Sequence, residues 1–202
     1  MGSFPHELPG YRHISDTQTR GEFEAHWGVT LNPEPGLRIP NMFDAALDGS
    51  FKGLYCQGED IVQSDPNTQH VAEALSSMEC IVVQDLFLNE TAKYAHVFLP
   101  GTSFLEKDGT FTNAERRINR VRPVLEAKTG LSEWETVCAL ATAMGYPMSY
   151  DHPSQIMDEI AHVTPTFANV SFALLDEVGS VQWPCNDMAP EGTPIMHVDG
   201  FV

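Results

Sequence analysis

Three acidic residues that directly follow short apolar segments are the strongest candidates for binding chemistry in this chain. Glu59 and Asp60 come after the segment Gly53–Gln57, and Asp85 comes shortly after Ile81–Val83. A carboxylate offers two acceptor oxygens, which match two ribose hydroxyls or the N1–H and 2-amino group of guanine. An acidic residue in this position can also cap the following helix, and both roles stay open for Asp60 and Asp85. Gly58 would let a ligand approach the backbone closely.

The sequence offers no reaction centre to accompany these residues. It has no GxGxxG or Walker motif, and its four cysteines are widely spaced without a CxxC pair. Its eight histidines form no HExxH or HxxxH pattern, so we expect no metal held by this chain alone. No serine, histidine and aspartate set suggests a nucleophile. We therefore predict a binding site with no catalytic residue.

The apolar segments predict a parallel sheet. Gly53–Gln57, Ile81–Val83 and Val97–Leu99 have the composition of buried strands, and helix-patterned segments lie between them. Parallel strands joined by right-handed crossovers place their carboxyl ends at one edge, where open α/β sheets bind ligands. The helices expected here are 15–27, 40–47, one opening at Asp65-Pro66 with Asp65 as N-cap, and 89–94.

The later part of the chain has a different pattern. Asp108-Gly109 is a good hairpin turn before strand-like segments at 110–112 and 118–121. Helices are expected at 132–144, 154–163 and 169–178, with an irregular tail from Gln182. The predicted fold class is α/β. It comprises a Rossmann-like, dinucleotide-binding-like half-domain over residues 1–112 and a smaller segment, a hairpin plus helices, over 113–202.

Composition limits the partners. The chain of 202 residues is 42% hydrophobic and carries a formal net charge of −17, which argues against nucleic-acid binding. It has no long apolar run and no signal-peptide pattern at its start, so we expect a cytoplasmic protein that binds no membrane. Arg116, Arg117, Arg120 and Arg122 form a local basic cluster. This cluster is either a charged edge strand or a contact for an anion or partner.

Four segments resemble one family. Residues 4–11 (FPHELPGY), 54–60 (LYCQGED), 83–92 (VQDLFLNETA) and 106–117 (EKDGTFTNAERR) are similar to the alpha (catalytic) subunit of molybdenum- or tungsten-dependent formate dehydrogenases. These enzymes belong to the molybdopterin oxidoreductase superfamily. Family subunits are several times longer, so the chain resembles an internal fragment. The iron–sulfur motif and the metal-ligating residue of the family have no counterpart here.

The resemblance implies a cofactor and a set of residues that contact it. The cofactor would be bis-molybdopterin guanine dinucleotide with molybdenum or tungsten. Gly58 and Glu59 would lie against the dinucleotide, and Asp85 would hold the guanine edge. The other expected cofactor-binding residues are Asp60, Gln84, Asn89, Thr91 and Asp108.

The resemblance also implies an activity for the complete enzyme. It would oxidise formate to carbon dioxide and pass electrons through iron–sulfur clusters, in soluble versions to NAD on a flavin subunit. The expected partners are the remaining alpha-subunit domains and the iron–sulfur and flavin/NAD-binding subunits. The fragment alone should be inactive and should self-associate through its exposed sheet edge. The alternatives are a nitrate reductase-like enzyme or NADH–quinone oxidoreductase large subunit, and a non-catalytic nucleotide-binding or interaction module.

Overall fold

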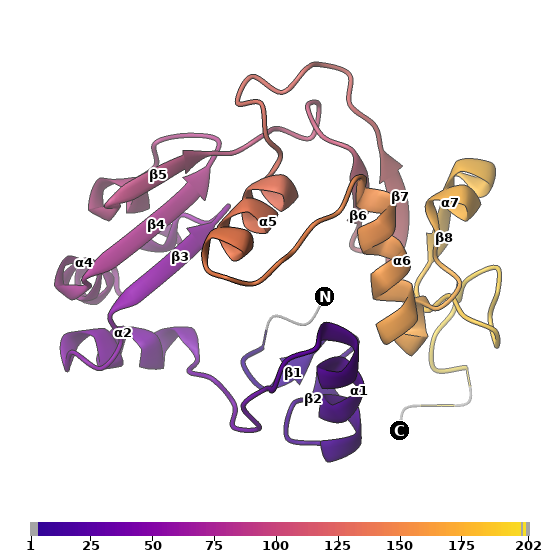
Figure 1. Cartoon of the computed structure of the whole chain (residues 1–202), viewed down its shortest axis with the longest axis horizontal. Coiled ribbons are helices and arrows are strands. Elements are labelled where there is room, and N and C mark those ends of the chain that lie inside the picture. Colours follow the sequence, from indigo (N-terminus) through magenta and orange to yellow (C-terminus); the bar gives the residue numbers. More distant parts are fainter. Residues whose placement is uncertain (1–3, 199, 201–202) are drawn as a thin grey trace. The chain divides into compact units, whose positions relative to one another are not determined.

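A computed structural model of the chain describes residues 4–198 and 200. The chain forms two compact units (Figure 1). The parallel-sheet unit comprises residues 36–106 and 125–133, and the helical unit comprises the residues before 36, 107–124 and those from 134 on. The first 35 residues thus group with the later part of the chain, whereas the predicted division placed them with the sheet.

The parallel-sheet unit contains the three strands expected from the apolar segments. They are β3 (Gly53–Gln57), β4 (Cys80–Asp85) and β5 (Val97–Pro100), in the order β3-β4-β5. Both pairings are parallel, with Gln57 opposite Gln84 and Asp85 opposite Pro100. The predicted α/β class with a parallel sheet is therefore confirmed, and the carboxyl ends of all three strands meet at one edge (Figure 1).

Short helices connect these strands. They are α2 (Ile39–Leu47), α3 (Ile61–Ser64), α4 (Thr68–Ser77) and the 3-10 turn η1 (Thr91–Tyr94).

Two predicted helix starts in this unit were wrong. The main helix begins at Thr68 with Asn67 as its N-cap, and the Asn67 side chain accepts a hydrogen bond from the His70 N–H. The Asp65 carboxylate instead accepts the Asn67 N–H at 2.9 Å, an Asx turn that delays the helix. The helix expected at 89–94 is shorter, the 3-10 turn η1, and the Asn89 side chain before it accepts the Ala92 N–H at 2.9 Å.

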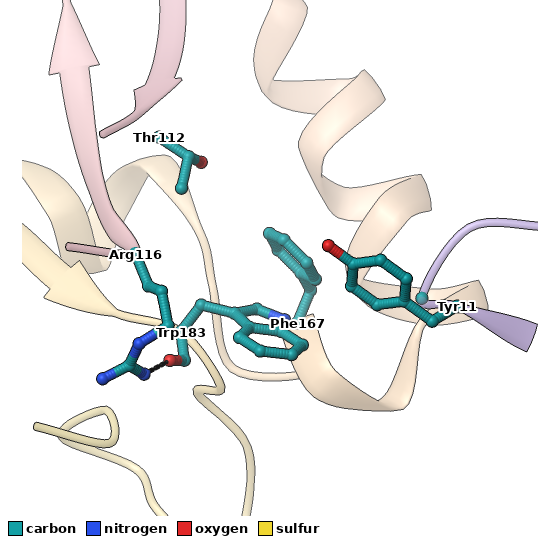
Figure 2. Close-up of a pocket in the computed structure, with 6 residues that line it drawn as sticks. Tyr11, Thr112, Arg116, Phe167 and Trp183 are labelled. Carbon is teal, nitrogen blue, oxygen red and sulfur yellow. Dashed lines mark hydrogen bonds between the residues drawn. The ribbon is translucent and has the colours of Figure 1, made fainter. Parts of the chain in front are cut away.

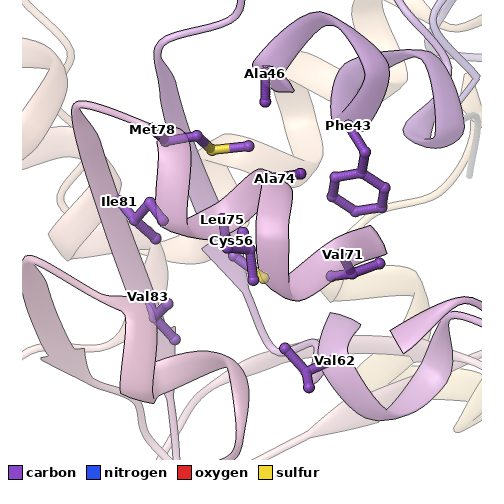
Figure 3. Close-up of a cluster of buried hydrophobic side chains, with 10 residues drawn as sticks. All are labelled: Phe43, Ala46, Cys56, Val62, Val71, Ala74, Leu75, Met78, Ile81 and Val83. Carbon is purple, nitrogen blue, oxygen red and sulfur yellow. The ribbon is translucent and has the colours of Figure 1, made fainter. Parts of the chain in front are cut away.

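One apolar core holds this unit together (Figure 3). Helices α2 and α4 contribute residues at helical spacing, and the strands contribute residues from one face of the sheet. The buried residues are Phe43, Ala46, Cys56, Val62, Val71, Ala74, Leu75, Met78, Ile81 and Val83. Burying an aliphatic side chain of this size stabilises a fold by about 1.5–3 kcal/mol, and the core residues of β3 and β4 belong to the strands that lead to the predicted site.

The helical unit contains two antiparallel sheets and four α-helices among its described residues. The sheets are β1 (Glu7–Leu8) with β2 (Arg12–His13), and β6 (Gly109–Thr112), β7 (Arg117–Val121) and β8 (Ser180–Gln182) in that order. The helices are α1 (Thr17–Trp27), α5 (Glu133–Ala143), α6 (Pro153–Val163) and α7 (Phe172–Val178), with the 3-10 turn η2 (Pro165–Phe167). Its core contains Ile118, Met157, Val170, Phe172, Leu175, Val181 and Cys185.

The hairpin of the helical unit turns at a different place from the one predicted. Gly109 is the first residue of β6 and pairs with Val121, so Asp108-Gly109 is not the turn. The turn lies at 113–116, where the Asn113 side-chain oxygen accepts the N–H groups of Glu115 and Arg117 at 3.1 and 2.9 Å. A short strand that was not predicted, β8, adds to β7 and ends at Gln182, and the described residues after it form no further helix or strand, as expected for the irregular tail. In the part of the chain that the structure describes, no helix has the length and apolar character of a membrane span.

Candidate functional site

The turn after β3 forms one side of the predicted site. Gly58 has φ +63°, a left-handed conformation that glycine adopts without strain, and its N–H donates to the Gln84 carbonyl at 2.9 Å. A Cβ atom built on Gly58 would meet no protein atom within 4 Å. The space beside this backbone is therefore open at the end of the sheet.

Gln84 is the most unusual residue at this edge. It is 1% exposed, and its Oε1 accepts the Tyr55 hydroxyl at 2.5 Å. Its Nε2 is buried and has no hydrogen-bond partner among the described residues. A buried donor without an acceptor costs about 1–3 kcal/mol, so this amide is an unsatisfied donor near the end of β4.

Asp85 follows Gln84 and is half-buried. Its Oδ1 accepts the Leu86 N–H at 2.5 Å, and its Oδ2 accepts the Asn89 Nδ2 at 2.9 Å. Each carboxylate oxygen can accept more than one hydrogen bond. Since Asn89 is itself fixed by capping η1, Asp85 is held in one orientation with acceptor capacity left on both oxygens.

Asp60, unlike Asp85, uses its carboxylate mainly in hydrogen bonds with Thr91. Asp60 Oδ1 accepts both the N–H and the hydroxyl of Thr91, at 3.0 and 2.7 Å. Its Oδ2 accepts Gln63 Nε2 at 2.7 Å and the Glu90 N–H at 3.3 Å. Burial raises the pKa of Asp60, but the hydrogen bonds from Thr91, Glu90 and Gln63 outweigh burial, so that its pKa lies below the ordinary value of 3.8.

The pairing of Asp60 with Thr91 gives both residues a positioning role. Thr91 is fully buried, and its hydroxyl oxygen also accepts the Val62 N–H at 3.2 Å. Asp60 therefore caps the start of η1, and its side chain makes no capping hydrogen bond to α3, the helix that directly follows it. The neighbouring Glu59 accepts a hydrogen bond from the Ser64 hydroxyl.

The cysteine of β3 is not a nucleophile at this site. Burial, followed by the nearby charges of Glu59, Asp85 and Asp60, raises the pKa of Cys56 to about 11. The thiol is therefore protonated near neutral pH and acts as an apolar core group.

Asp108 belongs to the helical unit, whereas the other predicted residues belong to the parallel-sheet unit. Its Oδ1 accepts Arg120 Nη1 at 2.5 Å, and His152 Nε2 is 3.4 Å from its Oδ2. The Arg120 side chain is only 6% exposed, and its guanidinium lies 3.8 Å from the centroid of the Phe172 ring. Asp108 is thus part of a charge network in the core of that unit.

The structure therefore brings together seven of the eight predicted residues at one sheet edge. These are Gly58, Glu59, Asp60, Gln84, Asp85, Asn89 and Thr91. Their cofactor-binding role stays a prediction.

Two other polar groups near this edge were not identified from the sequence. The Tyr55 hydroxyl donates a hydrogen bond to Gln84 Oε1. Burial, together with the charge of Glu133, raises the pKa of Tyr55. Glu133 accepts the Thr102 N–H and hydroxyl, at 3.0 and 2.7 Å. No local sequence pattern predicts this role of Glu133, because its partner Thr102 lies 31 residues away in the chain.

A small cavity lies within the helical unit (Figure 2). Its volume is about 110 Å³, and its lining includes Gly10, Tyr11, Thr112, Arg116, Phe167 and Trp183. Binding sites for drug-sized ligands are about 300–1,000 Å³, so this cavity is too small for a dinucleotide. Figure 2 shows Arg116 turned toward the main chain of Trp183, whose carbonyl accepts its hydrogen bond.

The arginine cluster is used for internal pairing. Arg116 also donates to the Thr193 and Pro194 carbonyls at 3.0 and 3.2 Å. Arg117 pairs with Glu115, while Arg120 and Arg122 share Asp176. These contacts favour the charged-strand interpretation over an anion site.

Comparison with known proteins identifies the family. A family model described as molybdopterin oxidoreductase matches residues 6–143. The chain belongs to the molybdopterin oxidoreductase family. Among curated relatives, this molybdopterin oxidoreductase chain is 44% identical over 204 residues to "Putative formate dehydrogenase SH0748" of Staphylococcus haemolyticus. It is 42% identical over 205 residues to "Putative formate dehydrogenase YrhE" of Bacillus subtilis.

Both alignments cover the whole molybdopterin oxidoreductase chain and 20% of each relative. The chain thus spans about a fifth of the length of these relatives, in agreement with the predicted internal fragment. Among solved structures, acetylene hydratase from Pelobacter acetylenicus is similar with a TM-score of 0.58 and 18% identity, over 84% of this chain and 24% of that chain. This likeness concerns the fold.

Proposed function

We propose that this chain is an internal segment of a formate dehydrogenase alpha subunit that binds the guanine end of a bis-molybdopterin guanine dinucleotide. Family membership supports a molybdopterin cofactor. The names of the relatives favour formate as the substrate over the nitrate or quinone chemistry of other family members. Molybdenum or tungsten would be the metal.

The observation that carries this proposal is the pair Gln84 and Asp85. The buried Gln84 Nε2 has no acceptor, and Asp85, the following residue at the end of β4, has a fixed carboxylate that can accept further donors. The guanine edge offers both a carbonyl acceptor and two parallel donors. Gly58 leaves space for the ligand beside the sheet, while Asp60, Thr91 and Asn89 hold the loops.

The cofactor, when bound, would supply the redox centre at which the complete enzyme oxidises formate to carbon dioxide. We propose no catalytic residue in this chain. Electrons would leave through iron–sulfur clusters to NAD or another acceptor, on the remaining domains and on iron–sulfur and flavin subunits. The four cysteines are free thiols, which fits the cytoplasm as a reducing location.

The test is a titration of the chain with GMP and with AMP, followed by amide NMR. We expect GMP to shift the signals of Gly58, Gln84 and Asp85, and AMP to shift them much less, because adenine lacks the two parallel donors. Asp85→Asn should abolish the preference for GMP, because its amide group presents a donor to guanine N1–H. Asp48→Asn is the matched control, since Asp48 also accepts a local backbone N–H, from Ser50 at 2.8 Å.

A folded chain whose strand-end signals do not move at millimolar GMP would contradict the proposed role of Gln84 and Asp85. Formate-dependent dye reduction is a second measurement. We expect none from the 202-residue chain, and turnover by the purified chain would disprove the assignment as a non-catalytic segment.

A further inference from the structure

The short β1–β2 hairpin of the helical unit gathers three potential metal ligands. These are His6, Glu7 and His13. One ligand atom from each lies within 4.8 Å of the others, and the described residues contain no other such group of three. The residues that carry the proposed function, Gly58, Gln84 and Asp85, belong to the other unit, so this cluster is independent of that function.

The register of the hairpin brings the three residues together. Glu7 pairs directly with His13, so their side chains lie on the same face. The Ile14 N–H donates to the His6 carbonyl at 2.9 Å and extends the pairing by one residue. As a result, the rings of His6 and His13 are 5.1 Å apart between centroids.

The Glu7 carboxylate lacks the hydrogen bonds that a buried charge requires. Its side chain is 11% exposed, and its Oε2 is buried with no hydrogen-bond partner in the described part of the chain. Its Oε1 is 3.6 Å from His6 Nε2. A buried carboxylate with an unsatisfied oxygen is costly unless it is paired or binds a metal, and a bound cation would satisfy this oxygen.

We propose that His6, Glu7 and His13 bind one divalent transition-metal ion, of which Zn²⁺ is the representative. Two neutral imidazoles and a carboxylate are a common ligand set for such ions. Bonds of about 2.0–2.1 Å in a tetrahedral site place ligand atoms about 3.4 Å apart. The 3.6 Å separation of His6 and Glu7 is already close to this value, and rotation of the exposed His13 ring can close the rest.

A second His–Glu–His group in the same unit shows what distinguishes the first. His26 Nε2 is 3.7 Å from Glu159 Oε1, and the rings of His26 and His162 are 5.0 Å apart. Both Glu159 oxygens already accept hydrogen bonds, from Trp27 Nε1 at 3.0 Å and from the Tyr150 hydroxyl at 2.5 Å. This carboxylate is satisfied without a metal, so His26 provides a matched control.

The experiment is a titration of the metal-stripped 202-residue chain with Zn²⁺ by calorimetry and with Co²⁺ by visible absorption. We expect one ion per chain, with a Co²⁺ spectrum that lacks thiolate charge-transfer bands, because the ligands are nitrogen and oxygen. Glu7→Gln and His13→Gln should each weaken binding by about 10-fold or more. His26→Gln should leave it unchanged. The same variants, measured by circular dichroism without metal, report whether the fold is intact.

Stability gives an independent readout. The ion would join two strands of only two residues each, so bound Zn²⁺ should raise the thermal midpoint of the wild type. It should not raise the midpoint of folded Glu7→Gln. The proposal is overturned if no ion binds, if Glu7→Gln and His13→Gln bind as tightly as the wild type, or if the Co²⁺ spectrum shows thiolate ligands. None of these outcomes bears on guanine binding at Asp85.

Discussion

At the residue scale, two aspartates that follow parallel strands have different environments. Asp60 uses both of its oxygens on the chain itself, mainly on Thr91, whereas Asp85 is held by two donors and retains acceptor capacity. The sequence placed both at the sheet edge but could not distinguish a structural carboxylate from one open to a ligand. That difference depends on Thr91 and Asn89, which reach the two aspartates only after the chain has folded.

The first prediction concerns Asp60. Asp60→Ala should lower the free energy of unfolding of the parallel-sheet unit by about 1–3 kcal/mol, because it leaves the buried Thr91 donors without an acceptor. The measurement is urea unfolding at pH 7, followed at the NMR signals of β4. Glu59→Gln is the control, and we expect a smaller loss because Glu59 accepts its bond from the exposed Ser64 hydroxyl.

The effect of Asp60 should depend on pH. Its pKa is lower in the folded chain than its ordinary value of 3.8, so ionised Asp60 stabilises the folded state above that value. This contribution is lost as the pH falls through 3.8 toward the folded pKa. The difference in stability between wild type and Asp60→Ala should therefore shrink between pH 5 and pH 3, which are about one unit either side of that value. A difference that grows on acidification would contradict the assigned pairing.

The second prediction compares two glycines of the same unit. Gly58 and Gly49 both have positive φ, and a Cβ on either would meet no protein atom within 4 Å. Each alanine substitution should cost about 1–2 kcal/mol of stability from backbone strain alone. Only Gly58→Ala should also weaken the GMP-induced NMR shifts, because its methyl group would fill the space at the strand end. Equal GMP responses in the two variants would argue against a ligand beside Gly58.

At the element scale, the β6–β7 hairpin is joined to a distant part of the chain. Arg116 has φ +66° in the turn, and its guanidinium donates to the carbonyls of Trp183, Thr193 and Pro194. The turn thus places the Arg116 side chain so that it holds the segment that follows β8. We call these three hydrogen bonds of Arg116 the clamp. A left-handed arginine is uncommon, and these three hydrogen bonds account for it here.

The third prediction tests this clamp. Arg116→Ala should increase amide hydrogen exchange at Trp183 and Thr193, whose N–H groups donate to the Arg116 and Gln182 carbonyls at 2.9 Å each. Exchange within β6 and β7 should change little. Arg122→Ala is the control, since its guanidinium bonds to the exposed Asp176. Equal protection at Thr193 in wild type and Arg116→Ala would show that the clamp is unnecessary.

The elements that could be predicted from sequence are those with strong local patterns. The apolar runs of β3, β4 and β5 and the spacing of Val71, Ala74 and Leu75 were sufficient for the parallel sheet and its main helix. The short strands β1, β2 and β8 were missed because two or three residues carry no measurable period. The hairpin turn was misplaced because Asp108-Gly109 has good turn composition, while Asn113 supplies the two side-chain hydrogen bonds that close the turn.

At the scale of the whole molecule, the chain is strongly acidic and exposes several large apolar side chains. In the parallel-sheet unit, Leu86, Phe87 and Leu88 are 49, 76 and 78% exposed and adjoin the candidate site. Both outer strands of its sheet, β3 and β5, have an edge without a strand partner in the described structure. Exposed apolar surface and free sheet edges favour association.

The fourth prediction follows from this surface. The purified chain should form dimers or larger species as its concentration rises, measured by light scattering coupled to size exclusion. Phe87→Ser with Leu88→Ser should shift the distribution toward the monomer. Met144→Ser is the control, because Met144 is also 78% exposed but belongs to the helical unit. A wild-type monomer at high concentration would count against the self-associating fragment.

The division of the chain has a consequence for the order in which it acquires structure on the ribosome. The parallel-sheet unit is almost one continuous segment, residues 36–106, whereas the helical unit needs residues from three separate segments. Arg12 donates to the Val163 carbonyl and Trp27 to Glu159, so the N-terminal residues need partners made much later. Because synthesis proceeds from the N-terminus, we expect the parallel sheet to fold before those N-terminal residues can form their native contacts. The N-terminal residues of this chain are thus among the last of its residues to reach their native contacts.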